Sequence, residues 1–68
     1  MNVTTLRTIT VERALRPAGF FTVTMCGGQF LGDDFSAWES AEMAFAEADH
    51  LKRDYGPAVI RDRTGGAR

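Results

Sequence analysis

Residues 36–56, SAWESAEMAFAEADHLKRDYG, decide the fold of this chain. Apolar side chains recur in this segment at steps of three and four residues, which is the spacing of one stripe along a helix. The stripe consists of Trp38, Ala41, Phe45, Ala48, Leu51 and Tyr55. Ser36 and Glu39 match a capping box at the start of the helix. Gly56 and Pro57 then end it, so the sequence predicts one amphipathic helix of about five turns.

Strand patterns lie on both sides of this helix. Residues 3–11, VTTLRTITV, are rich in threonine and β-branched side chains, which favour a strand. In residues 20–25 the apolar side chains of Phe21, Val23 and Met25 alternate with polar ones, the pattern of a half-buried strand. A tight type I′ turn at residues 27–28 is expected to return the chain as a paired strand over 29–31. Residues 58–60 predict a last short strand.

The expected order is therefore β-β-β-α-β, which predicts an α+β fold. A single amphipathic helix buries its stripe by lying across one face of a small antiparallel sheet. The opposite face would carry Thr22, Thr24 and Cys26, which suit water or a pairing interface. We expect one domain over residues 1–68, with a turn near Gly19 and a flexible tail over residues 64–68.

Length and composition exclude several classes of function. The chain has 68 residues, a net charge of −1 and a single cysteine, Cys26. A chain of this length supports one small core but no deep, water-excluding cleft. No disulfide, structural metal or cofactor is expected, because no paired Cys or His ligands occur. We find no signal-peptide pattern and no apolar run long enough to span a membrane, so we expect a cytoplasmic protein.

Charge is unevenly distributed along the chain. Residues 33–54 contain seven acidic and two basic residues, whereas the segments before and after carry a net charge of +2 each. Our candidate partner-binding residues are Asp33, Asp34, Glu39, Glu42, Glu47 and Asp49. Carboxylates spaced along a rigid helix resemble DNA phosphates in spacing and suit a channel lined by Lys and Arg. A merely solvated helix face would produce the same sequence pattern.

The sequence contains no pattern of side chains typical of a catalytic site. His50 is the only histidine, and it lacks the second, orienting group that acid–base catalysis requires. Asp54 follows it by four residues, which suits an ordinary pair on the helix surface. Cys26 is interpreted as a small strand residue. Phe35 and Trp38 suit either an exposed contact for a protein partner or the core, and we favour the core for both. We therefore expect no enzymatic activity.

In layout the chain resembles small phage-encoded anti-CRISPR proteins that inhibit type I systems. The resemblance lies in TTLRTITVE, AGFFTV, the glycine hairpin GGQFLG, the alanine-rich segment SAEMAFAEADHLKRDYG and the closing strand PAVI. It implies a protein inhibitor without enzymatic activity, which binds the RNA-guided surveillance complex through an acidic surface that mimics DNA. The arginines at both ends of this chain depart from a uniformly acidic mimic.

Two other functions fit the same sequence. In the first, the chain is a nucleic-acid-binding module, whose arginines converge if the first and last strands are neighbours. These arginines are Arg7, Arg13, Arg16, Arg61 and Arg63. In the second, the chain is a homodimeric interaction domain. The expectation that we favour is a protein partner with a basic surface, bound by a monomer or homodimer without direct nucleic-acid or membrane contact.

Overall fold

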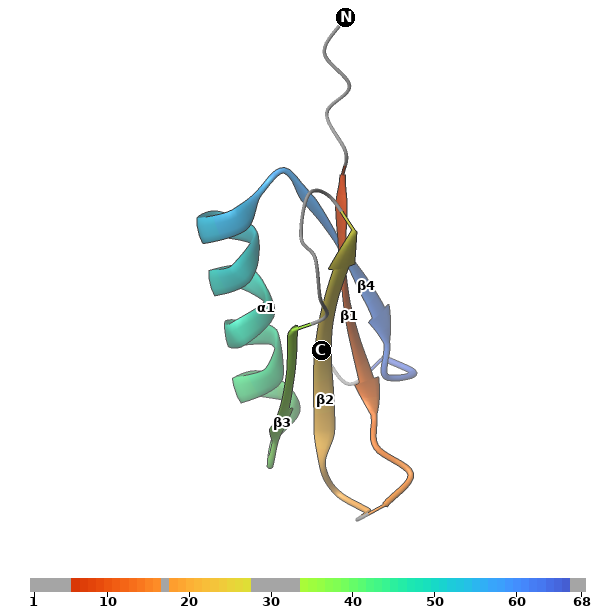
Figure 1. Ribbon diagram of the computed structural model, residues 1–68. Helices are drawn as coiled ribbons and strands as arrows, with labels where there is room; N and C mark the ends of the chain where they lie inside the picture. Colours follow the sequence, from red (N-terminus) through yellow and green to blue (C-terminus); the bar gives the residue numbers. More distant parts are fainter. Residues whose placement is uncertain (1–5, 17, 28–33, 67–68) are drawn as a thin grey trace, which may run out of the picture.

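Four strands and one helix make up the described part of the chain. The computed structural model describes residues 6–16, 18–27 and 34–66. In chain order the elements are β1 (Arg7–Arg13), β2 (Phe21–Gly27), β3 (Asp34–Trp38), α1 (Ala41–Tyr55) and β4 (Ala58–Arg63). Figure 1 shows α1 as a separate layer beside the sheet. The predicted α+β class, the β-β-β-α-β order and the single packed helix are confirmed.

The sheet has the strand order β3-β2-β1-β4 and is mixed. β2 runs antiparallel to both β1 and β3, as expected. β4 runs parallel to β1, with Ile60 opposite Ile9, which corrects the expectation of a purely antiparallel sheet. The reason is the crossover through α1. The helix runs back along the sheet, so β4 has the same direction as β3, and β3 has the same direction as β1 because both are antiparallel to β2.

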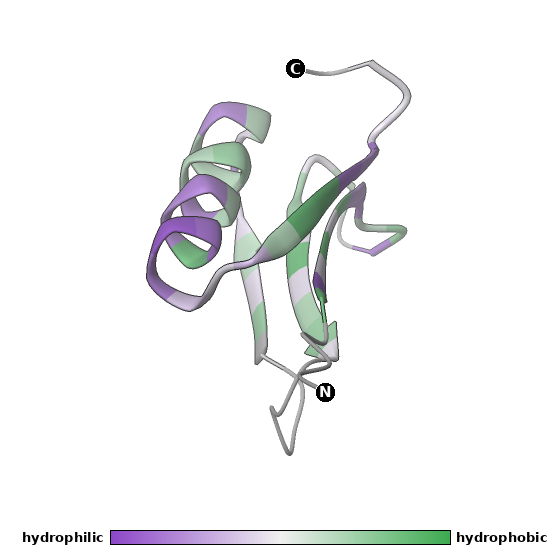
Figure 2. Ribbon diagram, turned by 90° about the horizontal axis from the view of Figure 1, so that it is seen from above, coloured by the Kyte–Doolittle hydropathy of each residue, from purple (hydrophilic) through white to green (hydrophobic). Residues whose placement is uncertain are grey.

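The core lies between α1 and one face of the sheet. Along the middle of β1 and the first five residues of β2, every second side chain is buried against the helix, namely Ile9, Val11, Phe21, Val23 and Met25. Bands of higher and lower hydropathy accordingly alternate along the strands in Figure 2. The buried cluster consists of Ile9, Val11, Phe21, Val23, Met25, Ala44, Phe45, Ala48, Leu51 and Ala58. The predicted core face of β2 is thereby confirmed. Burial of apolar surface of this kind is the main stabilising contribution to a domain of this size.

The helix begins later than predicted. Residues 34–38, expected to lead into and open the helix, form β3 instead. The N-cap is Ser40, whose hydroxyl oxygen accepts a hydrogen bond from the backbone N–H of Met43 at 3.2 Å. Ser36 is a strand residue, and its hydroxyl accepts a hydrogen bond from Trp38 Nε1 at 2.7 Å. Pairing with β2 therefore outweighs the capping signal at Ser36, and α1 has 15 residues, about four turns.

The stripe of the helix is largely as predicted. Phe45, Ala48 and Leu51 are buried, and Ala41 is half-buried against the core. Ala44, which the predicted stripe omits, is fully buried, whereas Tyr55 at the last turn is exposed. The small side chains of Ala44 and Ala48 allow α1 to approach the sheet closely.

The connection between β2 and β3 does not have the predicted register. Met25 lies opposite Asp34, whereas a two-residue turn at residues 27–28 would place Met25 opposite Phe30. The expected return strand over 29–31 lies outside the described residues. Gly27 has a φ of 93°, which glycine adopts without strain. The turn at Gly19, also at positive φ, agrees with its prediction.

The two aromatic residues of β3 lie on opposite faces of the sheet. Trp38 is half-buried and packs against the core, which confirms the prediction for this residue. Phe35 is 65% exposed and points away from the helix, so its predicted role in the core is wrong. The shift from helix to strand explains the difference, because alternate residues of a strand point to opposite faces.

The last turn of α1 is anchored to the first strand. The guanidinium Nη1 of Arg7 donates a hydrogen bond to the backbone carbonyl oxygen of Tyr55, and the backbone N–H of Arg7 donates to the carbonyl of Pro57. Gly56 ends the helix with a φ of −59°, so positive φ is not the reason for glycine here. A Cβ at this position would lie 2.6 Å from the carbonyl oxygen of Lys52, and only glycine avoids that contact.

A second anchor follows β4, where the sequence suggests a flexible tail. Thr64 is 2% exposed, and both its backbone N–H and its hydroxyl donate to Asp62 Oδ1, at 2.9 and 2.6 Å. Arg13 Nε donates to the carbonyl oxygen of Thr64 at 2.6 Å. The Arg13 guanidinium also lies 5.2 Å from the centre of the Phe21 ring. These contacts fasten the end of β4 to the end of β1.

Candidate binding surfaces

The acidic residues predicted to bind a partner are divided between a strand and the helix. Asp33 lies outside the described residues, and Asp34 opens β3. Glu39 is exposed in the short connection between β3 and α1. Glu42 and Asp49 are exposed on α1, seven residues apart, which places them on one side of the helix about 10 Å apart along its axis. The sequence-predicted set is therefore only partly brought together.

Glu47 belongs to a small ionic group around the only histidine. His50 Nδ1 lies 3.5 Å from Glu47 Oε1, and His50 Nε2 lies 2.7 Å from Asp54 Oδ2. The pair of His50 and Asp54 confirms the surface contact predicted from their four-residue spacing. Asp54 also lies 3.7 Å from Arg53 Nε. His50 is about half exposed on the outer side of the helix, so its ring faces solvent rather than an enclosed site.

Glu39 and Glu42 form the clearest part of the acidic surface. Within the ranges that the structure describes, neither carboxylate forms an ion pair with a basic side chain. Two of the chain's arginines are used elsewhere, since Arg7 binds the carbonyl of Tyr55 and Arg13 that of Thr64. We call the set Glu39, Glu42 and Asp49 the acidic helix surface, since Glu47 is half-buried beside His50 on another side of α1.

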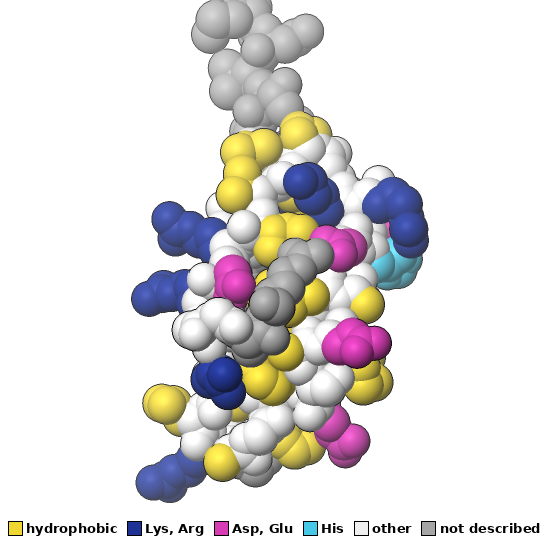
Figure 3. Space-filling model, turned by 180° about the vertical axis from the view of Figure 1, so that it is seen from behind, with side chains coloured by type: hydrophobic (Ala, Val, Ile, Leu, Met, Phe, Trp, Pro, Cys, Tyr) yellow, Lys and Arg dark blue, Asp and Glu magenta, His cyan; other side chains and the backbone are white. Residues whose placement is uncertain are grey.

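Basic side chains lie both in the last turn of α1, where Lys52 and Arg53 are exposed, and on the other side of the molecule. In Figure 3 several Lys and Arg side chains line the left edge, and most of the visible Asp and Glu side chains lie toward the right. Arg61 and Arg63 are exposed on β4, the edge strand beside β1. β1 and β4 are neighbours in the sheet, which is the condition under which the sequence predicts that the arginines of the first and last strands converge. Arg7 and Arg13 are nevertheless tied to backbone carbonyls, so the structure brings together only part of that set.

The face of the sheet that α1 leaves uncovered has two complete rows of residues. The first row runs across the four strands as Phe35, Thr24, Thr10 and Arg61. The second row runs as Ala37, Thr22, Glu12 and Arg63. We call these eight residues the open sheet face. The predicted polar character of this face is confirmed by Thr22 and Thr24, while the aromatic and basic ends of the first row were not foreseen.

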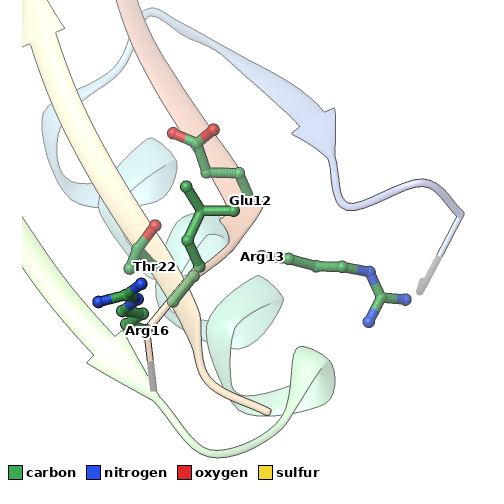
Figure 4. Close-up of a pocket in the computed structure, with 6 residues that line it drawn as sticks. Glu12, Arg13, Arg16 and Thr22 are labelled. Atoms are coloured by element: carbon green, nitrogen blue, oxygen red, sulfur yellow. The ribbon is translucent and has the colours of Figure 1, made fainter. Parts of the chain in front are cut away.

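A shallow depression of about 550 Å³ lies at one end of the open sheet face. It is lined by Glu12, Arg13, Ala14, Leu15, Arg16 and Thr22. Figure 4 shows Arg16 on the same side as Glu12 and Thr22, whereas Arg13 extends away from them. The exposed Arg16 therefore adds a third basic side chain at the border of this face.

Possible metal ligands and a thiol occur in the described ranges. Residues 6–16, 18–27 and 34–66 contain no group of three His, Cys, Asp or Glu side chains placed to hold a metal ion. Cys26 is a free, exposed thiol at the end of β2. None of the described helices is both long and apolar enough to cross a membrane.

Comparison with protein-family models, curated proteins and solved structures gives no match to this chain.

Proposed function

We propose that this protein is a non-enzymatic inhibitor that binds a basic surface of another protein through the acidic helix surface. The observation that carries the proposal is the exposed position of Glu39, just after the edge strand β3, and of Glu42 on α1, whereas the exposed arginines of β4 lie at the opposite edge of the sheet. A rigid helix whose other side is anchored in a core presents such carboxylates in fixed positions. Fixed charges of one sign speed association and set the orientation of a complementary partner.

The partner that we propose is a protein whose own ligand is nucleic acid. Such proteins hold phosphates in channels lined by Lys and Arg, and carboxylates at similar spacing compete for the same side chains. The resemblance to anti-CRISPR proteins suggests the surveillance complex of a type I CRISPR system as the target, in the cytoplasm of a bacterial host. Binding there would block the access of target DNA.

The proposal is tested with a purified type I surveillance complex and a labelled target duplex. We expect the wild-type protein to prevent the gel shift of the duplex, and the double variant Glu39→Lys/Glu42→Lys to lose this inhibition. Both side chains are exposed and outside the core, so the thermal melt followed by circular dichroism should be nearly unchanged.

Glu12→Lys serves as the control for net charge against the single variants Glu39→Lys and Glu42→Lys, each of which should weaken the inhibition. All three substitutions reverse one charge, but Glu12 lies on the open sheet face. Inhibition should persist in this control. A surveillance complex that binds DNA equally well with and without the wild-type protein would reject the type I target. Full inhibition by the double variant would reject the acidic helix surface.

A further inference from the structure

The open sheet face has a chemistry that the proposed inhibitor function does not use. It lies on the opposite side of the sheet from α1, so Glu42 and Asp49 do not border its two rows, whereas Glu39 follows Ala37 of the second row by two residues. Arg61, Arg63 and nearby Arg16 bring three positive charges, against the negative charges of Glu12 and of Asp62, which lines a depression together with Arg61 and Arg63. This side of the molecule is therefore basic although the chain as a whole has a net charge of −1.

The first row joins an aromatic ring and a guanidinium through hydroxyl groups. Phe35 stands at the β3 edge and Arg61 at the β4 edge, with Thr24 and Thr10 between them. Three strand spacings separate the two edges, which is about 14 Å. Threonine hydroxyls both donate and accept hydrogen bonds, so the strip between the two edges is polar and adaptable.

The exposed ring of Phe35 distinguishes between polyanions. A polyanion without rings, such as polyglutamate, offers only charges to the arginines, whereas a single-stranded nucleic acid also has unstacked bases that stack on an aromatic side chain. Phe35 is 65% exposed on the same face as Arg61 and Arg63, and the core does not require it. An aromatic ring exposed at one edge of a sheet face whose other edge is basic fits a ligand that has both phosphates and flat bases.

We propose that the open sheet face binds single-stranded nucleic acid. Arg61 and Arg63 contact the phosphates along the β4 edge, and Phe35 stacks on a base at the β3 edge. Arg16 extends the phosphate contacts past the end of β1, where it borders the depression beside Thr22. The site does not depend on the inhibitor function, because it uses the other layer of the molecule and none of the acidic helix residues.

The test uses the full chain and a fluorescein-labelled oligothymidylate of about 12 nucleotides, followed by fluorescence anisotropy. We expect binding at about 50 mM salt that weakens steeply by about 200 mM salt, because phosphate contacts release counterions. In the double variant Arg61→Gln/Arg63→Gln, the slope of log affinity against log salt should fall by about 1.4, that is, about 0.7 for each lost contact.

Arg53→Gln is the matched control, since Arg53 is also exposed but lies on α1. It should bind the oligonucleotide like the wild type. Phe35→Ala should lower the affinity about 5- to 150-fold, the effect of losing one stacked base. Phe35→Leu should lose as much affinity, because leucine has no ring to stack on a base although it keeps apolar bulk. Phe35→Tyr keeps a ring and should retain the affinity.

Several results would overturn the site. They are an unchanged anisotropy at low salt, an equal loss of affinity in Arg53→Gln, an unaltered affinity in Phe35→Ala, and displacement of the oligonucleotide by an equimolar polyglutamate peptide. Circular dichroism of each variant keeps the test decisive, because the substituted side chains are exposed and the fold should persist. The surveillance-complex assay has an independent readout, so failure of one function is distinguishable from failure of the other.

Discussion

Arg7 of β1 binds Tyr55 at the end of α1, where the crossover from β3 to β4 leaves the helix. The Arg7 guanidinium donates to the backbone carbonyl of Tyr55, one of the carbonyls that a helix leaves without an internal partner at its last turn. A positive charge at that end also complements the partial negative charge of the helix dipole. One side chain of β1 thus holds α1 in place where β4 begins.

Arg7→Ala is therefore expected to destabilise the protein by about 1–2 kcal/mol. The loss comprises a charge-assisted hydrogen bond and the favourable interaction with the helix end. Urea unfolding gives the free energy, and Arg61→Ala is the matched control, because Arg61 is exposed on the edge strand. A loss below about 0.5 kcal/mol, equal to that of an ordinary surface substitution, would contradict the role of Arg7.

Ser40→Ala should remove the N-cap of α1. Ser40 accepts from the N–H of Met43, and replacing such a cap by alanine costs about 1 kcal/mol. Ser40→Asp keeps an acceptor and adds a favourable charge at the helix start, so its stability should equal or exceed that of the wild type. Thermal melts of the two variants decide the matter, and equal stabilities would show that the cap contributes nothing.

Local periodicity explains how far the sequence predicts this fold. The alternation of Phe21, Val23 and Met25 and the helical spacing of Phe45, Ala48 and Leu51 depend only on neighbouring residues, and both are confirmed. The class and the element order follow from them. The parallel pairing of β4 with β1 joins residues about 50 positions apart, for example Ile9 and Ile60, and no local pattern encodes it.

The start of the helix shows why local signals can mislead. Ser36 with Glu39 satisfies the capping pattern better than Ser40, which has Met43 at the corresponding position. The choice is made by β2, which pairs with residues 34–38 and leaves the helix to begin after Ser40. The same pairing turns Phe35 outward, so the aromatic end of the open sheet face could not be predicted without the register.

The exposure of some acidic residues could be predicted from local periodicity. Glu42 and Asp49 are exposed because the apolar stripe fixes the buried side of α1, which the sequence alone indicates. The sequence does not distinguish the arginines that bind within the fold from those that remain exposed. Arg7 and Arg13 bind backbone carbonyls, while Arg61 and Arg63 remain exposed, and only the tertiary contacts distinguish the two pairs.

Thr64→Val is expected to destabilise the protein by about 1–2 kcal/mol. The two side chains have nearly the same shape, but valine cannot donate to Asp62 Oδ1, and the site is buried. Thr64→Ser keeps the donor and should cost less than Thr64→Val. The comparison is made by urea unfolding. A valine variant as stable as the wild type would show that the end of β4 is not fastened by this hydroxyl.

Ala48 and Ala46 provide the sharpest test of how α1 packs. Ala48 is fully buried against the sheet, whereas Ala46, two residues earlier, is exposed on the same helix. Leucine is as good a helix former as most residues, so helix propensity changes little at either position. Ala48→Leu should destabilise the protein by about 1–3 kcal/mol, because extra methyl groups push α1 from the sheet. Ala46→Leu should stay within about 0.5 kcal/mol of the wild type. If the two leucine variants unfold at the same urea concentration, the buried side of α1 is not the one that faces β1 and β2.

The outward position of the acidic helix surface depends on the same orientation of the helix. It would then be wrong as well.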